Sequence, residues 1–239
     1  VTLASHGNNT FDVAGAASSI SGTLKVAAGT LTLDVPPAGP PTNAAAYYSF
    51  DSVVGTTVPN LGTLGSAKDA TLLNGAGTTA GGKLGGGMTI ADGSSQRLDV
   101  AAAGSIDIGA EWTVATWFQD LHDTNNWRTL VRGNQNDHQL MVENGSNRLG
   151  IYANGRGEFR PASPQTNLLP YNGWHHLTAI GRANDTTDFY VDGIYVASSD
   201  RGSTTNISWI GNGDTGWGQS FANVLDEFVV YNRAIGLGE

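Results

Sequence analysis

The chain has 239 residues, enough for one large β domain, and six Trp, seven Tyr and seven Phe from which a core can be built. Only 14% of the residues are charged and 33 are Gly, a composition typical of tightly turned β proteins that argues against a helical bundle. The net charge of −9, with only three Lys, argues against binding of nucleic acid or anionic lipid through a basic face.

The sequence contains no Cys, which excludes disulfides, thiolate catalysis and Cys-ligated zinc sites. No apolar run approaches the ~20 residues that a membrane helix needs, so we expect no membrane insertion by this segment. The chain starts at Val1 without a signal peptide, so we expect a processed form or a fragment of a larger protein.

Residues 1–35 show two short alternating phrases, Gly22-Thr23-Leu24-Lys25-Val26 and Gly29-Thr30-Leu31-Thr32-Leu33. Their period of two predicts β structure. They resemble the Gly-Thr-Leu-rich β repeats of autotransporter passengers and related bacterial surface proteins, which stack into solenoids. Two interpretations stay open: a fragment of such a repeat, or a terminus that adds a strand to the main domain.

A Pro-rich segment, residues 36–43, follows and holds four of the eight prolines. Such a segment cannot pair in a central strand and favours an extended spacer. The sequence therefore predicts a short N-terminal β segment at 1–35, a linker at 36–43 and a large domain at 44–239.

The large domain reads as many short strands without helical periodicity. Asp192-Gly193 lies between two runs of β-forming residues, the strongest short hairpin signal, because a type I′ turn needs positive φ at both central positions. We expect an all-β, two-sheet antiparallel sandwich of jelly-roll type. The predicted strands are Tyr47–Phe50, Trp112–Gln119, Arg128–Arg132, Gln139–Glu143, Leu149–Ala153, Trp174–Gly181, Asp188–Val191, Tyr195–Ser198, Ile207–Ile210 and Leu225–Tyr231.

Several motifs of this domain follow one another in an order found in a known family. They are Tyr48-Ser49-Phe50-Asp51, Ala91-Asp92-Gly93, the run 112–118, the run 174–179, Phe189-Tyr190-Val191-Asp192-Gly193 and the run 225–234. In this order and spacing they resemble the laminin-G-like, concanavalin-A-like jelly rolls of bacterial secreted proteins. The resemblance implies a carbohydrate-binding or adhesion module of a larger secreted or cell-surface protein of bacterial origin.

Catalysis is the less favoured interpretation of the sequence, and we predict that the chain is not an enzyme. A retaining glycoside hydrolase needs two carboxyl groups about 5–5.5 Å apart, and none of the five Glu has an acidic partner two or four residues away. Asp226 and Glu227 are adjacent, so strand alternation would point them to opposite faces. The same argument separates His175 from His176. Candidates for lyase chemistry exist, namely His138, His175, His176, Tyr152, Arg156 and Arg160.

Sugar binding needs an aromatic platform with polar side chains beside it. Two predicted loops, 120–128 and 211–219, each place a Trp among polar or glycine residues, and a third polar loop spans 155–164. Trp127 and Trp217 could form a platform or could be buried anchors of their loops, whereas Trp117 and Trp174 have the apolar alternate neighbours of core residues. The candidate ligand-binding residues are Trp127, Arg128, Asn126, Trp217, Asp214 and Arg156.

A structural role is the alternative to ligand binding. The solenoid-like front segment and the Pro-rich linker favour a spacer or assembly module that docks to neighbouring domains of the parent chain or forms an oligomer. Such a module would have no affinity for saccharides.

The family resemblance also implies one structural calcium ion that joins the first strand, a middle loop and the last strand. The matching positions are Asp51, Asp92, Gly93 and Asp226. Calcium takes six to eight oxygen ligands from carboxylates and carbonyls. The alternative is that Asp51 and Asp92 serve turns and Asp226 accepts local backbone hydrogen bonds.

Overall fold

The computed structural model describes residues 41–239 except 92–94, 120–126, 135–136, 147, 154–157, 162–172, 212–218, 220–222 and 237–239. The chain divides into two compact units, Val1–Pro36 and Pro37–Glu239, and every described residue lies in the second. The predicted β segment 1–35 and most of the linker 36–43 lie outside the described residues, so this division of the chain stays a prediction.

Two antiparallel sheets of eight strands each form the described part of the chain. Sheet A has the order β14 (Ile194–Ser199), β13 (Thr186–Val191), β12 (Trp174–Arg182), β7 (Trp112–Gln119), β16 (Asn223–Tyr231), β5 (Gly87–Ile90) and β4 (Gly77–Thr79), with β1 (Ala46–Tyr48) also paired to β16. Sheet B has the order β11 (Glu158–Pro161), β10 (Leu149–Ala153), β9 (His138–Val142), β8 (Arg128–Gly133), β15 (Ile207–Gly211), β6 (Arg97–Asp99), β3 (Ala70–Leu73) and β2 (Thr57–Val58).

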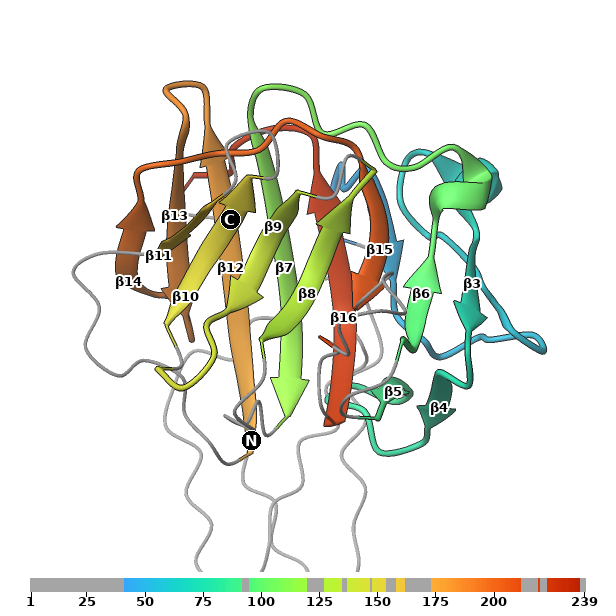
Figure 1. Ribbon diagram of the computed structural model, residues 1–239. Coiled ribbons are helices and arrows are strands. Elements are labelled where there is room, and N and C mark those ends of the chain that lie inside the picture. Colours follow the sequence, from blue (N-terminus) through green and yellow to red (C-terminus); the bar gives the residue numbers. More distant parts are fainter. Residues whose placement is uncertain are drawn as a thin grey trace, which may run out of the picture. The chain divides into compact units, whose positions relative to one another are not determined.

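The two sheets stack face to face, with β10, β9 and β8 lying across β12, β7 and β16 (Figure 1). Strands that are neighbours in a sheet are often far apart in sequence, as when β7 lies between β12 and β16. This crossed order, together with antiparallel pairing throughout, confirms the predicted jelly-roll sandwich.

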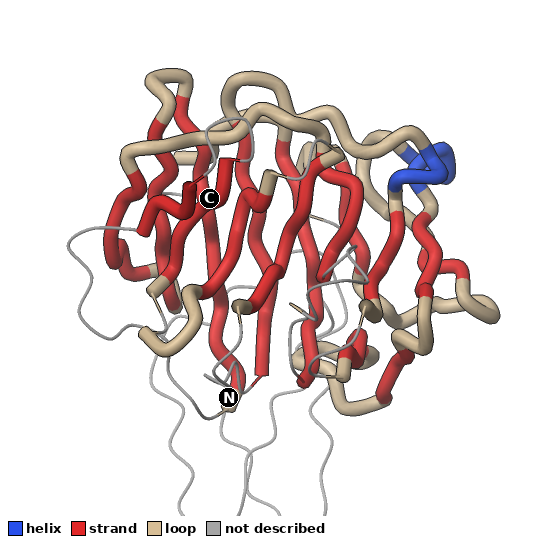
Figure 2. The backbone as a smooth tube through the Cα atoms, viewed as in Figure 1, coloured by secondary structure: helices blue, strands red, loops and turns tan. Residues whose placement is uncertain are grey.

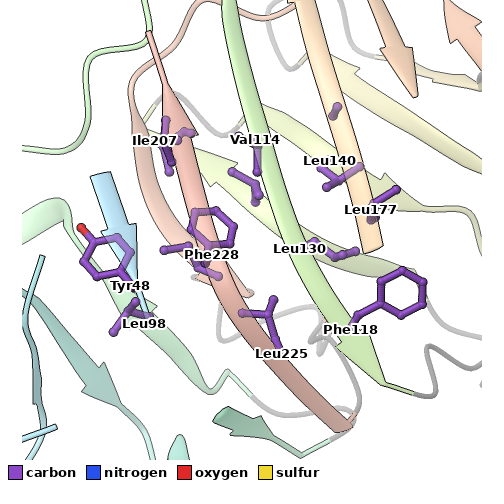
Figure 3. Packing of buried hydrophobic residues seen from close by; sticks show 14 of the residues in the cluster. Tyr48, Leu98, Val114, Phe118, Leu130, Leu140, Leu177, Ile207, Leu225 and Phe228 are labelled. Atoms are coloured by element: carbon purple, nitrogen blue, oxygen red, sulfur yellow. The ribbon is translucent and has the colours of Figure 1, made fainter. Parts of the chain in front are cut away.

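The core lies between the sheets and takes one face of each strand. From sheet A come Val114, Phe118, Leu177 and Phe228, and from sheet B come residues such as Leu140, all fully buried. Figure 3 shows these side chains meeting in the space between the strands. The opposite face of each sheet is therefore left for polar or aromatic side chains, and that is where the candidate sites lie.

The predicted hairpin at Asp192-Gly193 is confirmed. Asp192 and Gly193 have φ of 52° and 75°, both in the left-handed region that a type I′ turn requires. The turn joins β13 to β14, whose residues pair from Val191 with Ile194 to Thr187 with Ser199.

All ten predicted strands are present, most within one or two residues of the predicted bounds. The short strands β2 to β6 and β11, of two to four residues, are absent from that prediction. Among the described residues, helix is limited to two 3-10 turns, Gly65–Lys68 and Ala101–Ala103, which Figure 2 shows at one end of the sandwich.

Candidate functional site

Aromatic side chains of β10, of β11 and of Trp127, the residue before β8, lie on the outer face of sheet B. Tyr152 of β10 is directly paired with Phe159 of β11, so the two side chains lie on the same face. Ile151, the residue before Tyr152, points into the core, so Tyr152 and Phe159 point away from it. The rings of Trp127 and Phe159 meet edge to face with centroids 4.9 Å apart. Trp127, Phe159 and Tyr152 are each partly exposed. We call these three residues the sheet B strip.

Gly150 makes the sheet B strip possible. A Cβ at this position would lie 2.5 Å from the ring of Phe159 and 2.5 Å from the carbonyl oxygen of Arg160. The missing side chain therefore leaves the space in which the Phe159 ring lies over β10, next to Trp127. Glycine in a strand often marks such a close approach.

Polar groups continue from the strip toward the middle of sheet B. His138 is paired with Tyr152 across β9 and β10, and their rings meet edge to face at 5.6 Å. Its Nδ1 lies 2.7 Å from the hydroxyl of Thr129. The backbone N–H of Thr129 donates to the carbonyl of Gln219, which brings the end of the 211–219 loop to this face.

A second aromatic group on the same face surrounds Trp209 of β15. Its cross-strand partners are Asp99 and Arg132, and its ring nitrogen donates to the Asp99 carboxylate at 2.8 Å. The guanidinium groups of Arg97 and Arg132 lie 5.8 and 5.6 Å from the ring centre. Asp99 also pairs with Arg97 at 3.1 Å, so the group is a connected network of charge and aromatic surface.

Of the predicted ligand-binding residues, the structure places two. Trp127 is partly exposed and belongs to the sheet B strip, whereas Arg128 is 1% exposed and lies within the sandwich. Asn126, Arg156, Asp214 and Trp217 lie outside the described residues.

The predicted calcium ligands Asp51 and Asp226 meet at one glycine-rich loop, residues 81–87. The N–H of Gly86 donates to Asp51 at 2.6 Å, and the N–H of Leu84 donates to Asp226 at 2.9 Å. A Cβ at Gly82 would lie 2.8 Å from Asp226 and would also strike the carbonyl oxygen of Gly86. The carboxylates of Asp51, in the turn after β1, and of Asp226, in β16, thus flank one loop, and its glycines let it pass close to them.

Asp226 is completely buried, and no ion pair joins it to any residue that the structure describes. Burial raises its pKa to about 7, although N–H groups of the glycine loop and of Glu227 lower it. Burial also raises the pKa of the neighbouring Glu227, against the hydrogen bond from the Tyr47 hydroxyl. One of the two Glu227 carboxylate oxygens, Oε1, is buried and has no hydrogen-bond partner among the described residues.

The expectation that Asp226 and Glu227 point to opposite faces fails at this place. Glu227 has φ of 52°, and the pairing of β16 with β7 shifts register between Asp226 and Val229. A β-bulge of this kind suspends the alternation of side chains, and the two carboxylates come to act on one another.

The described residues around the loop 81–87 supply some, but not all, of the oxygen ligands that calcium needs. Among the described residues, no group of three or more His, Asp or Glu side chains could hold a metal ion. The available oxygens are the carboxylates of Asp51 and Asp226 and the carbonyls of the loop and of Phe50, 2.6 Å from a Cβ at Gly86. Calcium accepts such mixed ligands. Asp92 and Gly93, the other predicted positions, lie outside the described residues.

His175 and His176 separate as strand alternation predicts. His175 Nδ1 lies 2.7 Å from the Asp192 carboxylate, while the His176 ring packs on the edge of Trp117 at 5.1 Å. Partial burial lowers the pKa of His176, and nearby Asp192 opposes this. The two imidazoles do not form a shared metal or catalytic site.

Three aromatic residues of these surfaces were not predicted as such. Phe159 and Trp209 were not singled out from the sequence, and Trp117 was assigned to the core but is partly exposed on the outer face of sheet A.

No helix among the described residues is long and apolar enough to cross a membrane.

Solved structures of similar fold include a sialidase, a domain of an arabinanase and the receptor-binding domain of a neurotoxin. A sialidase of Trypanosoma rangeli in complex with sialic acid matches with a TM-score of 0.59 and 15% identity, over 84% of this chain and 32% of the sialidase. Domain 4 of AbnA, an extracellular arabinanase from Geobacillus stearothermophilus, in complex with arabinotriose, matches with a TM-score of 0.59 and 16% identity. That match covers 82% of this chain and 95% of the domain.

The receptor-binding domain of botulinum neurotoxin C/D mosaic serotype also matches, with a TM-score of 0.52 and 12% identity over 82% of this chain and 49% of that one. At these identities the likeness shows the fold alone. The chain spans about a third of the length of the sialidases that it matches.

The prediction that the chain is not an enzyme is wrong, because the arguments behind it do not exclude catalysis. The fold is shared with chains of sialidases, so neither the fold nor the scarcity of Glu separates a binding domain from part of an enzyme. The argument from strand alternation, which kept Asp226 and Glu227 apart, also fails at the bulge.

No curated protein matches the sequence. A laminin-G-type family model matches residues 92–239, well over half of the chain, and these residues form β6 to β16 of the sandwich with its crossed strand order. The chain belongs to the concanavalin A-like lectin/glucanases superfamily.

Proposed function

We propose that this domain binds glycans through the outer face of sheet B. The observation that carries the proposal is the sheet B strip, in which Trp127, Phe159 and Tyr152 stay partly exposed on one face of a rigid sheet. Aromatic rings on a sheet surface offer flat apolar area against which the apolar face of a sugar ring packs.

The groups beside the strip suit a ligand rich in hydroxyls. The linked pair of Thr129 and His138 borders Tyr152 but is buried. The groups of this face that stay partly exposed are Trp209 and Arg97, which the buried Asp99 holds in place. Binding sites of this kind combine apolar contact with a few well-placed polar groups that set orientation. Because strands hold Tyr152, Phe159 and Trp209, and Trp127 packs on Phe159, little ordering of these side chains is needed on binding.

The fold neighbours support a glycan as ligand. One of them is a domain solved with arabinotriose and another is a sialidase solved with sialic acid. Laminin-G-like domains are typically extracellular, and the proposal accordingly places this domain outside the cell, in a secreted or surface protein whose neighbouring domains would be its other partners.

A glycan array tests the proposal. Hits are then titrated by calorimetry, together with arabinotriose and 3′-sialyllactose, against the wild type and the variants Trp127→Ala, Phe159→Ala and Trp217→Ala. Tyr231→Ala is the matched control, because it removes a partly exposed ring from sheet A. We expect Trp127→Ala and Phe159→Ala each to weaken binding by about 1–2 kcal/mol, or five- to thirtyfold, and the control to bind normally. Trp217→Ala tests the second loop that the sequence predicts as a binding site.

The proposal fails if no glycan binds, or if Trp127→Ala and Phe159→Ala bind as tightly as the control. The same samples are assayed for shortening of each bound oligosaccharide. Because His138 and Tyr152 lie side by side on this face, any turnover is followed up with His138→Gln and Tyr152→Phe.

We also propose that one calcium ion stabilises the domain at the loop 81–87. Asp51 and Asp226 would hold it with backbone carbonyls of the loop, and Asp92 and Gly93 are the further positions that the family resemblance implies. The support is electrostatic: Asp226 is buried without a cationic partner among the described residues, and a bound divalent cation would offset the cost of its charge.

A further inference from the structure

A second aromatic surface crosses the outer face of sheet A, on the opposite side of the sandwich from the sheet B strip. Trp117 of β7 pairs with His176 of β12, and Tyr190 of β13 pairs with Tyr195 of β14. The two tyrosine rings meet edge to face at 5.6 Å, and Tyr195 is 50% exposed. We call these four residues the sheet A row.

An exposed lysine lies on this row. Lys83 extends from the glycine loop, and its ammonium lies 4.4 Å from the centre of the Trp117 ring. Its backbone is fixed because the loop donates hydrogen bonds to Asp226, the cross-strand neighbour of Trp117. Lys83 forms no ion pair with any residue in the described part of the chain, so its only charge-dependent side-chain contact is the indole.

The carboxylates of this face are already engaged. Asp188 accepts hydrogen bonds from Arg182 at 2.8 Å and from Ser198 at 2.5 Å. Asp192 accepts from the backbone of His176 and lies against His175. Asp226 is buried beneath the loop. Two further carboxylates border the glycine loop: Asp51 accepts the N–H of Gly86, and Glu227 accepts the Tyr47 hydroxyl. The charge that lies directly on the Trp117 ring is the positive charge of Lys83.

We propose that the sheet A row is a separate binding site for a carboxylate-bearing saccharide, such as a uronate. The sugar ring would pack on the Trp117 indole in place of the lysine. A cation–π contact at an exposed site is weak, so the Lys83 ammonium can leave the ring and pair with the sugar carboxylate, a stronger charge-assisted contact. Tyr190 and Tyr195 would take the next sugar units.

The site does not depend on the proposed function of sheet B. It uses other strands and other side chains, and its ligand is set by the Lys83 ammonium beside Trp117 rather than by the sheet B strip. A strongly acidic protein with net charge −9 repels polyanions in general. Affinity for an acidic sugar would therefore come from a local site such as Lys83 and not from overall charge.

The test uses trigalacturonate and a hyaluronan hexasaccharide, each compared with the same oligosaccharide after its carboxyl groups are reduced to alcohols. Calorimetry is run on the wild type, Lys83→Gln, Trp117→Leu and Lys68→Gln, with Trp127→Ala as a sheet B variant. Lys68→Gln is the matched control, because it makes the same change in charge at a lysine bonded to the Ala103 carbonyl. Thermal melting checks that Trp117→Leu is folded.

We expect at least one acidic oligosaccharide to bind about tenfold more tightly than its reduced form. Lys83→Gln should abolish that preference and Trp117→Leu should weaken both forms, whereas Lys68→Gln and Trp127→Ala should behave like the wild type. The proposal is overturned if neither acid binds at millimolar concentration, if acid and reduced forms bind equally, or if Lys83→Gln keeps the preference. Loss of binding in Trp127→Ala alone would assign the acid to sheet B and also overturn it.

Discussion

Gly150→Ala is a small change with a large expected effect on the sheet B strip. The new methyl group would lie 2.5 Å from the backbone oxygen of Arg160 and 2.5–2.6 Å from two carbons of the Phe159 ring. The ring can rotate away, but the carbonyl belongs to the paired strand β11 and cannot. Overpacking costs about 1–3 kcal/mol, and the alanine returns about 0.4–1 kcal/mol by restricting the unfolded chain. We expect a net loss of about 1–2 kcal/mol.

Urea unfolding followed by tryptophan fluorescence measures this loss, and glycan titration measures the accompanying displacement of Phe159 from Trp127. Gly81→Ala is the matched control, because its Cβ would meet only the Thr79 hydroxyl at 3.5 Å. In a Phe159→Ala background the cost of Gly150→Ala should fall, since part of the clash is gone. If Gly150→Ala is as harmless as Gly81→Ala, or costs the same without Phe159, the described packing of the strip is wrong.

Three further predictions concern pH, calcium and the N-terminal segment. Burial lowers the pKa of His176 in the fold, so its contribution to stability is complete above the unfolded pKa of about 6.5 and declines as pH falls below it; unfolding at pH 7.5 and 5.0 should show a smaller decline in His176→Gln than in the wild type. Calcium at a hundred times its Kd should raise the Tm of the wild type by about 5–10 °C. The same rise is expected in the control Asp188→Asn but not in Asp226→Asn. If chelator leaves the Tm unchanged and elemental analysis finds no metal, the proposed calcium site is wrong. If residues 1–43 assemble the protein, light scattering should detect a larger particle for 1–239 than the added mass explains when compared with 44–239, and equal oligomeric states would end the assembly hypothesis.

The longer strands could be predicted because two sequence signals agree there: a run of β-forming residues and turn residues at both of its ends. Trp112–Gln119 and Asn223–Tyr231 are long enough for β-branched and aromatic residues to stand out between turn residues. The strands β2 to β6 have two to four residues and contain Gly, Thr or charged residues. Among them, β5 and β6 pair with the longer strands β16 and β15, and β4, β3 and β2 pair in turn with these short strands. Such tertiary pairing leaves little trace in local sequence.

Site residues were harder to predict because the sequence does not reveal which face of a strand is covered. Trp117 has Ala115 as an alternate neighbour, which suggested the core, yet Ala115 belongs to a small apolar cluster on the outer face of sheet A with Tyr47 and Val229. Arg128 shows the converse error, since a charged residue beside a polar loop is 1% exposed. The polar residues around Trp127 correctly indicated that its side chain is partly exposed, but they did not reveal that the side chain of Arg128 is buried.

The bulge at Glu227 shows why one irregular position can determine the chemistry of a whole edge of the sandwich. Regular alternation would send the carboxylates of Asp226 and Glu227 to opposite faces. With Glu227 at φ of 52°, Asp226 stays under the glycine loop while Glu227 accepts a hydrogen bond from the Tyr47 hydroxyl. Burial is the main cause that raises the pKa values of Asp226 and Tyr47, and Glu227 raises both further. The same loop fixes the backbone of Lys83 and so carries its ammonium to Trp117. The proposed calcium site and the proposed acidic-sugar site therefore share a scaffold, and loss of order in the loop would weaken both.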